Sequence, residues 1–178
     1  MSDYVVIARF DEETDEKITH LRELLTDAGY PVSQWPPHIT LAAYENFDEK
    51  LLRAWTSEFS SRHKKISVAL ASLSVFPPGG GQTETAVLCL NPAHSKSLVD
   101  FYYEFHARYD EYCTGIGWFY SLSFGNPVIH ATIGTIRVNE LQKAMELVFS
   151  SGVFRSAEMI ALEVYTYPAR LIQRFALK

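Results

Sequence analysis

PHITLAAY at residues 37–44 and VIHATIGTI at residues 128–136 share one pattern, around which the rest of the chain is arranged. Each contains a His-x-Thr triplet within a run of apolar, largely β-branched residues, which is typical of a buried strand. Side chains alternate between the two faces of a strand. His38 and Thr40 therefore share one face of the first strand, and His130 and Thr132 share one face of the second.

Up to residue 81 the apolar patterns predict the order strand, helix, strand, helix, strand. Asp11 is a helix-capping residue type, and Gly29 is a typical stop at the end of the apolar periodicity. Asn46 followed by Glu49 resembles a capping box for the second helix. The predicted elements are strands Tyr4–Phe10, His38–Tyr44 and Ile66–Phe76, a helix from Asp11 to Ala28, and a helix capped by Asn46 that carries Trp55 and Phe59.

The second part of the chain repeats this order and adds one strand. Asn139 with Gln142 predicts the cap of its second helix, which ends at Gly152. The predicted elements are strands Thr85–Leu90, Val128–Ile136, Glu158–Tyr167 and, after a turn at Pro168, Arg170–Leu177, with helices Ser95–Tyr109 and Asn139–Gly152 and a long aromatic loop Asp110–Pro127. The sequence therefore predicts one α+β domain of duplicated β-α-β-α-β units, with pseudo-symmetric halves 1–81 and 82–178.

The composition narrows the possible functions. Hydrophobic residues make up 47% and charged residues 21% of the 178 residues, which excludes a disordered or collagen-like chain. The net charge of −5 disfavours a protein that coats long nucleic acid, but it permits a small anion in a local pocket. The chain shows no membrane span and no signal-peptide pattern, so we expect a cytoplasmic protein without a membrane partner.

The two His-x-Thr strands predict a shared reaction site if a pseudo-twofold axis brings their polar faces together across a cleft. A single His-x-Thr pair on a strand is more often an ordinary surface pair. Two such pairs in matching positions of a repeated pattern favour a role in binding or catalysis over that interpretation. Two imidazoles near their free pKa of ~6.5 can act as base and acid, and the threonine hydroxyls can donate hydrogen bonds to phosphate. A base, an acid and phosphate-binding hydroxyls together suit nucleophilic displacement at phosphorus. Cys89 and Cys113 lack metal-site spacing and no HExxH motif is present, so we expect no metal.

These motifs resemble the paired H-x-T-hydrophobic motifs of the 2H phosphoesterase superfamily, which includes 2′-5′ RNA ligase-like proteins and 2′,3′-cyclic nucleotide phosphodiesterases. The resemblance extends over nearly the whole chain. It implies two antiparallel-sheet lobes with a central cleft, the 2′-5′ RNA ligase-like fold. It also implies that His38 and His130 are the catalytic pair, that Thr40 and Thr132 contact the phosphate, and that neither a metal nor an organic cofactor takes part.

Some positions depart from better-known members. Gly134 and Thr135 stand where many RNA ligase-like members have an arginine, and the first arginine is Arg137. The aromatic loop Asp110–Pro127 also differs. Phe76, at the end of SVFP, resembles the segment that lends an aromatic ring to the cleft rim, where it can stack on a base. An ordinary core phenylalanine is an equally good interpretation.

The resemblance implies a monomeric, metal-independent phosphoesterase that acts on a 2′,3′-cyclic phosphate or a 2′-5′ linkage of a nucleotide or RNA end. Two alternatives stay open: a nucleotide- or RNA-binding module without turnover, and a phosphodiesterase for a non-RNA cyclic phosphate. The sequence assigns neither the direction of the reaction nor which histidine is the base. The histidines outside the motifs are expected at the surface: His20, His63, His94 and His106.

Overall fold

The order of elements confirms the predicted α+β fold. The structure, a computed structural model, describes residues 2–81, 83–167 and 169–178, so the predicted turn at Pro168 lies outside the described residues. The strands are β1 (Ser2–Phe10), β2 (His38–Phe47), β3 (Ile66–Phe76), β4 (Thr85–Pro92), β5 (Ala131–Arg137), β6 (Ser156–Thr166) and β7 (Arg170–Ala176). The helices are α1 (Glu12–Asp27), α2 (Glu49–Arg62), α3 (Lys96–Phe105) and α4 (Leu141–Ser150), with 3-10 turns η1 (Asp110–Tyr112), η2 (Gly115–Tyr120) and η3 (Val138–Glu140).

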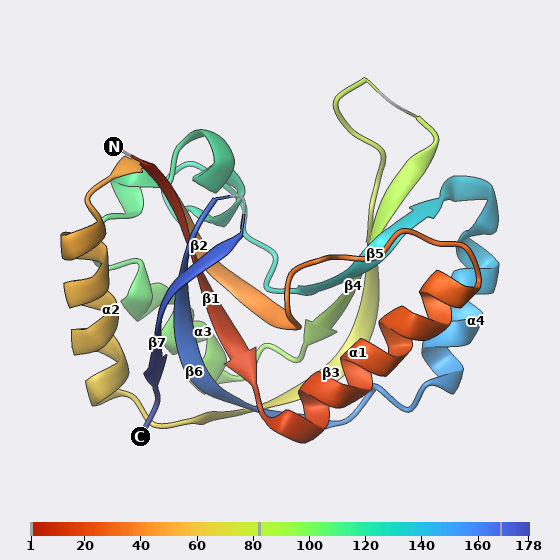
Figure 1. The fold of residues 1–178 in the computed structure, drawn as a ribbon, viewed down its shortest axis with the longest axis horizontal. Helices are drawn as coiled ribbons and strands as arrows, with labels where there is room; N and C mark the ends of the chain where they lie inside the picture. Colours follow the sequence, from red (N-terminus) through yellow and green to blue (C-terminus); the bar gives the residue numbers. More distant parts are fainter. Residues whose placement is uncertain (1, 82, 168) are drawn as a thin grey trace.

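The strands form an antiparallel sheet that β3 divides into two lobes (Figure 1). Residues Ile66–Ala69 of β3 pair with β6, whereas its second part, from Leu70 to Phe76, pairs with β4. The first lobe therefore contains β1, β2, β6 and β7, and the second lobe contains β4 and β5. This arrangement agrees with the two antiparallel-sheet lobes expected from the resemblance.

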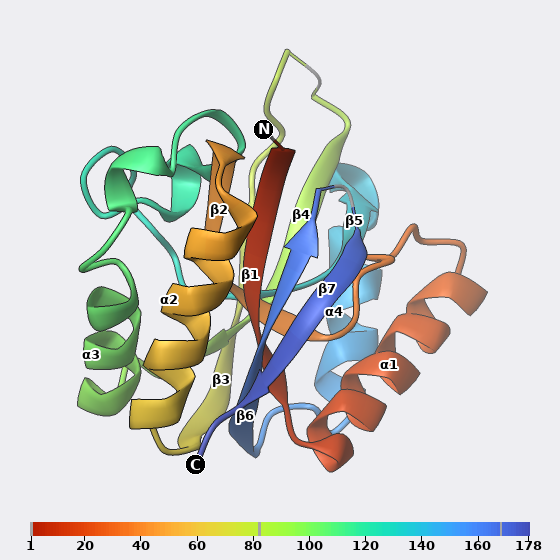
Figure 2. The ribbon, with the colours of Figure 1, turned by 60° about the vertical axis from the view of Figure 1, so that its left-hand side comes forward.

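The helices cross between the lobes. Helix α1 follows a strand of the first lobe but packs against α4 and β5. Helix α3 follows a strand of the second lobe but packs against α2, where the indole of Trp55 donates a hydrogen bond of 3.2 Å to the Phe105 carbonyl. Figures 1 and 2 show α2 beside α3 and α1 beside α4. Strands β6 and β7 also join the first lobe, so each lobe combines both parts of the chain, while the division at residue 81 stays a prediction.

Two predicted helix caps are wrong. Asn46 is part of β2 and has a φ of 51°, a left-handed conformation that asparagine tolerates better than most residues. Asp48 caps α2 instead, because its carboxylate accepts a 2.9 Å hydrogen bond from the Leu51 amide. Asn139 lies inside η3, and no side chain caps α4. No helix of the described residues is long and apolar enough to cross a membrane.

The predicted surface position of His106 is also wrong. Its Nδ1 donates to the Asp110 carboxylate at 2.7 Å, its Nε2 donates to the Leu41 carbonyl of β2 at 2.8 Å, and the residue is buried. The same carboxylate accepts hydrogen bonds from the Ser121 hydroxyl and the Ser123 amide. The predicted aromatic loop is thus an ordered segment, and hydrogen bonds attach it to β2. The i,i+4 spacing of His106 and Asp110 was the sequence feature that could have predicted their contact.

Gly117 lets this aromatic segment approach β2 closely. A Cβ at this position would lie 1.8 Å from the Ala43 carbonyl oxygen, and no side-chain rotation relieves a clash with backbone. We expect Gly117→Ala to destabilise the protein by about 1–3 kcal/mol, as other overpacking substitutions do. Chemical unfolding measures the effect. Gly79→Ala is the matched control, because no atom lies within 4 Å of its Cβ position. Equal unfolding midpoints for the two variants would contradict the close approach.

Candidate active site

The first motif stands at the start of β2, where His38 pairs with Arg9 of β1. The Nδ1 of His38 donates a 2.6 Å hydrogen bond to the carbonyl of Pro36, two residues earlier. This contact places the proton of the neutral imidazole on Nδ1. Nε2 then carries the lone pair, and it lies 3.1 Å from the Thr40 hydroxyl, which donates to it.

The second motif repeats this arrangement. His130 lies immediately before β5, so the predicted strand start at Val128 is corrected to Ala131. The Nδ1 of His130 donates to the carbonyl of Val128, again two residues earlier, at 2.5 Å. Both imidazoles are therefore oriented by the same local contact, which leaves Nε2 of each ring available for proton transfer. Thr132 lies on β5, and its hydroxyl is 3.9 Å from the Cys89 sulfur.

A cavity of about 190 Å³ brings three of the predicted site residues together. Its lining includes His38, Thr40 and Thr132. His130 is not part of this lining, but it is close enough for its charge to lower the pKa of His38. The aromatic side chains of the lining were not predicted as a group, and they come from three separate segments: Trp35, Tyr120 and Tyr167.

The two motifs meet because the segment before His38 binds the edge of β5. We call residues 31–35 the linking segment. The Pro31 carbonyl accepts a 2.8 Å hydrogen bond from the Thr135 amide, and the Ser33 amide donates to the Ile133 carbonyl at 3.2 Å. Gly134 allows this approach, since a Cβ there would lie 2.8 Å from the Pro31 carbonyl oxygen. The glycine that departs from better-known sequences thus has a packing role.

Burial lowers the pKa of both motif histidines. For His38 the pKa falls to about 4, mainly through burial, with further lowering by the charges of Arg22, His130 and Arg9, against the opposing hydrogen bond to Pro36. For His130 burial is again the main cause, and the hydrogen bond to the Val128 carbonyl opposes it. Both imidazoles are therefore neutral near pH 7.

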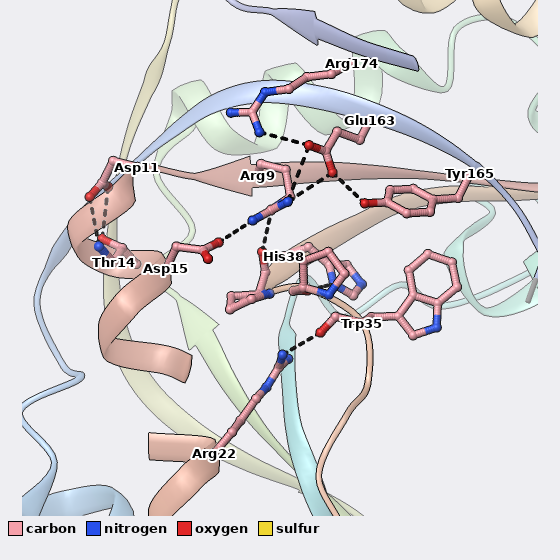
Figure 3. Close-up of polar contacts among 12 residues, drawn as sticks. Arg9, Asp11, Thr14, Asp15, Arg22, Trp35, His38, Glu163, Tyr165 and Arg174 are labelled. Atoms are coloured by element: carbon pink, nitrogen blue, oxygen red, sulfur yellow. Dashed lines mark hydrogen bonds and ion pairs between the residues drawn. The ribbon is translucent and has the colours of Figure 1, made fainter. Parts of the chain in front are cut away.

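A network centred on Arg9 supports the first motif (Figure 3). Its Nε donates to the Pro37 carbonyl at 3.1 Å, next to His38. Its two terminal nitrogens bind Asp15 at 2.5 Å and the buried Glu163 at 3.1 Å. Glu163 also accepts a hydrogen bond of 2.9 Å from Arg174 on β7. Arg9 therefore fixes the backbone that precedes His38.

Two aromatic rings stand beside the second histidine. The ring centroid of Phe76 lies 4.8 Å from that of His130, and the ring of Phe119 lies 5.9 Å from it. Phe76 is partly buried and reaches this place from the end of β3. Its predicted stacking on a base stays a prediction. Phe119 belongs to η2 of the aromatic segment.

One buried cluster has metal-ligand residue types. His106, Asp110 and Cys113 offer ligand atoms that lie within 4.8 Å of one another. Both imidazole nitrogens already donate hydrogen bonds to other groups, and burial raises the pKa of Cys113 to about 12. A metal ligand must be an unprotonated nitrogen or a thiolate. This cluster therefore does not fit a metal ion and serves to anchor the aromatic segment.

The comparisons with known proteins concern the family and the fold of the chain. The sequence profile of the 2′-5′ RNA ligase superfamily matches residues 10–165. Among solved structures, LigT of E. coli in apo form has a TM-score of 0.60 at 15% identity and covers 99% of this chain and 98% of its own. For TT0787 of Thermus thermophilus the TM-score is 0.61 at 11% identity, with 98% and 97% covered.

Usb1 of Kluyveromyces marxianus has a TM-score of 0.53 at 11% identity, with 99% of this chain and 98% of its own covered. At these identities the structures show a shared fold. No curated protein matches the chain. The family profile covers most of the chain, including both His-x-Thr motifs. The chain therefore belongs to the 2′-5′ RNA ligase superfamily.

Proposed function

We propose that this protein is a metal-independent phosphoesterase that hydrolyses a 2′,3′-cyclic phosphate or a 2′-5′ linkage at a nucleotide or RNA end. The observation that carries the proposal is that His38 and His130 make the same Nδ1 contact to a carbonyl two residues earlier, while His38, Thr40 and Thr132 line one cavity. Solved structures of E. coli LigT in complex with 3′-AMP and with phosphate support a nucleotide ligand. The proposal also takes the protein to act as a monomer in the cytoplasm.

The different surroundings of the histidines assign their roles in this proposal. His38 is the base, because its burial beside two arginines keeps the imidazole neutral, with a lone pair on Nε2. His130 is the acid, because the negative charge of a bound phosphate raises its pKa and protonates it. When phosphate is bound, the Thr40 hydroxyl donates to a non-bridging phosphate oxygen instead of to His38 Nε2, which frees that lone pair for the base, and the Thr132 hydroxyl donates to another phosphate oxygen.

The reaction on a cyclic phosphate then balances within this site. His38 Nε2 takes a proton from water while the water oxygen forms a bond to phosphorus. The bond from phosphorus to one ribose oxygen breaks, and His130 Nε2 gives its proton to that oxygen. The products are a phosphomonoester and a free hydroxyl. Each proton transfer contributes about 10²–10⁴-fold to the rate.

The size of the cavity favours a small substrate. Its volume of about 190 Å³ is below the usual ~300–1,000 Å³ of ligand pockets. Such a volume favours a mononucleotide or a strand end over an internal stretch of RNA. A non-RNA cyclic phosphate of similar size remains the alternative substrate, and a binding module without turnover remains the alternative function. Turnover assays on each substrate distinguish them.

Replacing either histidine tests the catalytic pair. We expect His38→Ala and His130→Ala each to lower kcat by about 10²-fold or more on a 2′,3′-cyclic nucleotide, because one proton transfer is lost. Thr40→Val has a smaller effect on kcat, since it removes a hydrogen-bond donor but no proton transfer. His20→Ala is the control, because His20 is exposed on α1. Near wild-type turnover in either motif variant would refute the pairing.

The pKa shifts predict an acidic pH optimum for kcat/KM in the free enzyme. Activity rises as the pH passes about 4, where His38 loses its proton and becomes a base. It falls as the pH passes the lowered pKa of His130, where the acid loses its proton, and this limb lies below the ordinary value of 6.5. The two limbs are properties of the coupled pair. A pH–rate profile with its maximum well above pH 7 would contradict these role assignments.

The chemistry also predicts independence from metal ions, because a histidine pair supplies both proton transfers without a Lewis acid. We expect hydrolysis of a 2′,3′-cyclic nucleotide to continue at an unchanged rate in excess EDTA. The control is a metal-dependent phosphodiesterase in the same buffer, which loses activity. Loss of turnover in EDTA with recovery on adding a divalent ion would overturn the proposed mechanism.

A further inference from the structure

Arg22 connects the two His-x-Thr motifs although it belongs to neither. It lies on α1, and only 7% of its surface is exposed. One terminal nitrogen donates a 2.6 Å hydrogen bond to the carbonyl of Trp35, just before the first motif. The other donates a 2.7 Å hydrogen bond to the carbonyl of Thr132, inside the second motif. Figure 3 shows the side chain extending from α1 toward Trp35.

The position of this guanidinium coincides with the end of the contact between the linking segment and β5. Backbone hydrogen bonds join the two as far as Ser33 and Ile133. Beyond that point Arg22 bridges the two chains, because it binds the carbonyl of Trp35, two residues after Ser33, and the carbonyl of Thr132, one residue before Ile133. A guanidinium is a planar, rigid fork, so it holds its two acceptors at a set separation.

We propose that Arg22 is a positioning residue for the reaction, which sets the separation of the two motifs by bridging the carbonyls of Trp35 and Thr132. The inference rests on the proposed function. A second observation supports it: the Nε of Arg22 is buried without a partner among the described residues. Burying a guanidinium with an unsatisfied donor costs stability. The guanidinium therefore lies where its terminal nitrogens bind the two carbonyls, although its Nε–H is left without an acceptor among the described residues.

Arg22 also supplies charge to the base. The charged groups that act on His38 are Arg22 from α1, Arg9 from β1 and His130 before β5. The charge of Arg9 is compensated by direct ion pairs with acidic side chains. The direct partners of Arg22 are neutral carbonyls, and Asp15 and Arg9 act on it only through their charges. The positive charge of Arg22 therefore disfavours protonation of His38 and keeps the base available.

Two substitutions separate geometry from charge. Arg22→Lys keeps the positive charge but cannot bridge two carbonyls as a fork. Arg22→Gln keeps a hydrogen-bond donor but removes the charge. Arg53→Lys and Arg53→Gln are the matched controls, because Arg53 is exposed on α2 and contacts Gln173 and Glu49. For each protein the measurements are kcat and KM against pH on a 2′,3′-cyclic nucleotide, and the NMR titration of the His38 imidazole.

We expect both Arg22 variants to lose about 10²-fold in kcat, as small misplacements of reacting groups do, with KM changed far less. The acid limb of kcat/KM stays in place for Arg22→Lys. For Arg22→Gln it moves to higher pH, and the His38 titration moves with it, because protonation is no longer opposed. If a variant only lost part of its folded population, the active fraction would fall but the acid limb of kcat/KM would not move. The Arg53 variants are expected to resemble the wild type in both measurements.

Two results would overturn the inference. One is wild-type kcat in Arg22→Gln, and the other is an unmoved His38 titration in that variant. The titration needs no substrate, so it separates this inference from the proposed function. If the wild type hydrolyses no cyclic nucleotide, the proposed function fails. The inference is then judged by whether Arg22→Gln shifts the His38 titration and the backbone amide signals of Thr132 and its neighbours.

Discussion

The candidate site depends on one backbone contact, the pairing of the linking segment with the edge of β5. The two motifs lie on different lobes, which share β3 and are also joined by helix α1, since it packs against β5 and α4. Hydrogen bonds from the Thr135 amide to the Pro31 carbonyl and from the Ser33 amide to the Ile133 carbonyl bring the start of β2 to the second lobe. Gly134 makes this possible because any side chain there would meet the Pro31 carbonyl. The cavity exists where this contact ends.

Main-chain carbonyls organise the polar groups around that cavity. A carbonyl two residues before each motif histidine fixes its tautomer, and the carbonyls of Trp35 and Thr132 receive the guanidinium of Arg22. The charged side chains of Arg9 and Arg22 are therefore not part of the cavity lining. Among the lining residues that the structure describes, the only ionisable base is the imidazole of His38, and none is an aspartate, glutamate, arginine or lysine. Positive charge in that position keeps the imidazole of His38 neutral and favours an anionic ligand in front of it.

The order of elements was predictable, because helix and strand periodicity are local properties of a sequence. Strand alternation was enough to place Thr40 beside the imidazole of His38. The burial of Arg22 had a weak signal, since it falls on the apolar face of α1 with Ile18 and Leu25, but a charged residue there is usually read as solvent-facing. The caps were misassigned because Asn46 takes a left-handed conformation within β2.

The cavity and its electrostatics lay beyond the reach of local patterns. Arg22 binds carbonyls 13 and 110 positions away in the chain, and the aromatic residues of the lining come from three distant segments. Such contacts arise only when α1 crosses to the second lobe and the aromatic segment docks on β2. The sequence alone identified the two His-x-Thr motifs and predicted the acid–base chemistry that a histidine pair can perform. Folding in three dimensions determined their separation, their burial and the charges around them, because these depend on residues far apart in the chain.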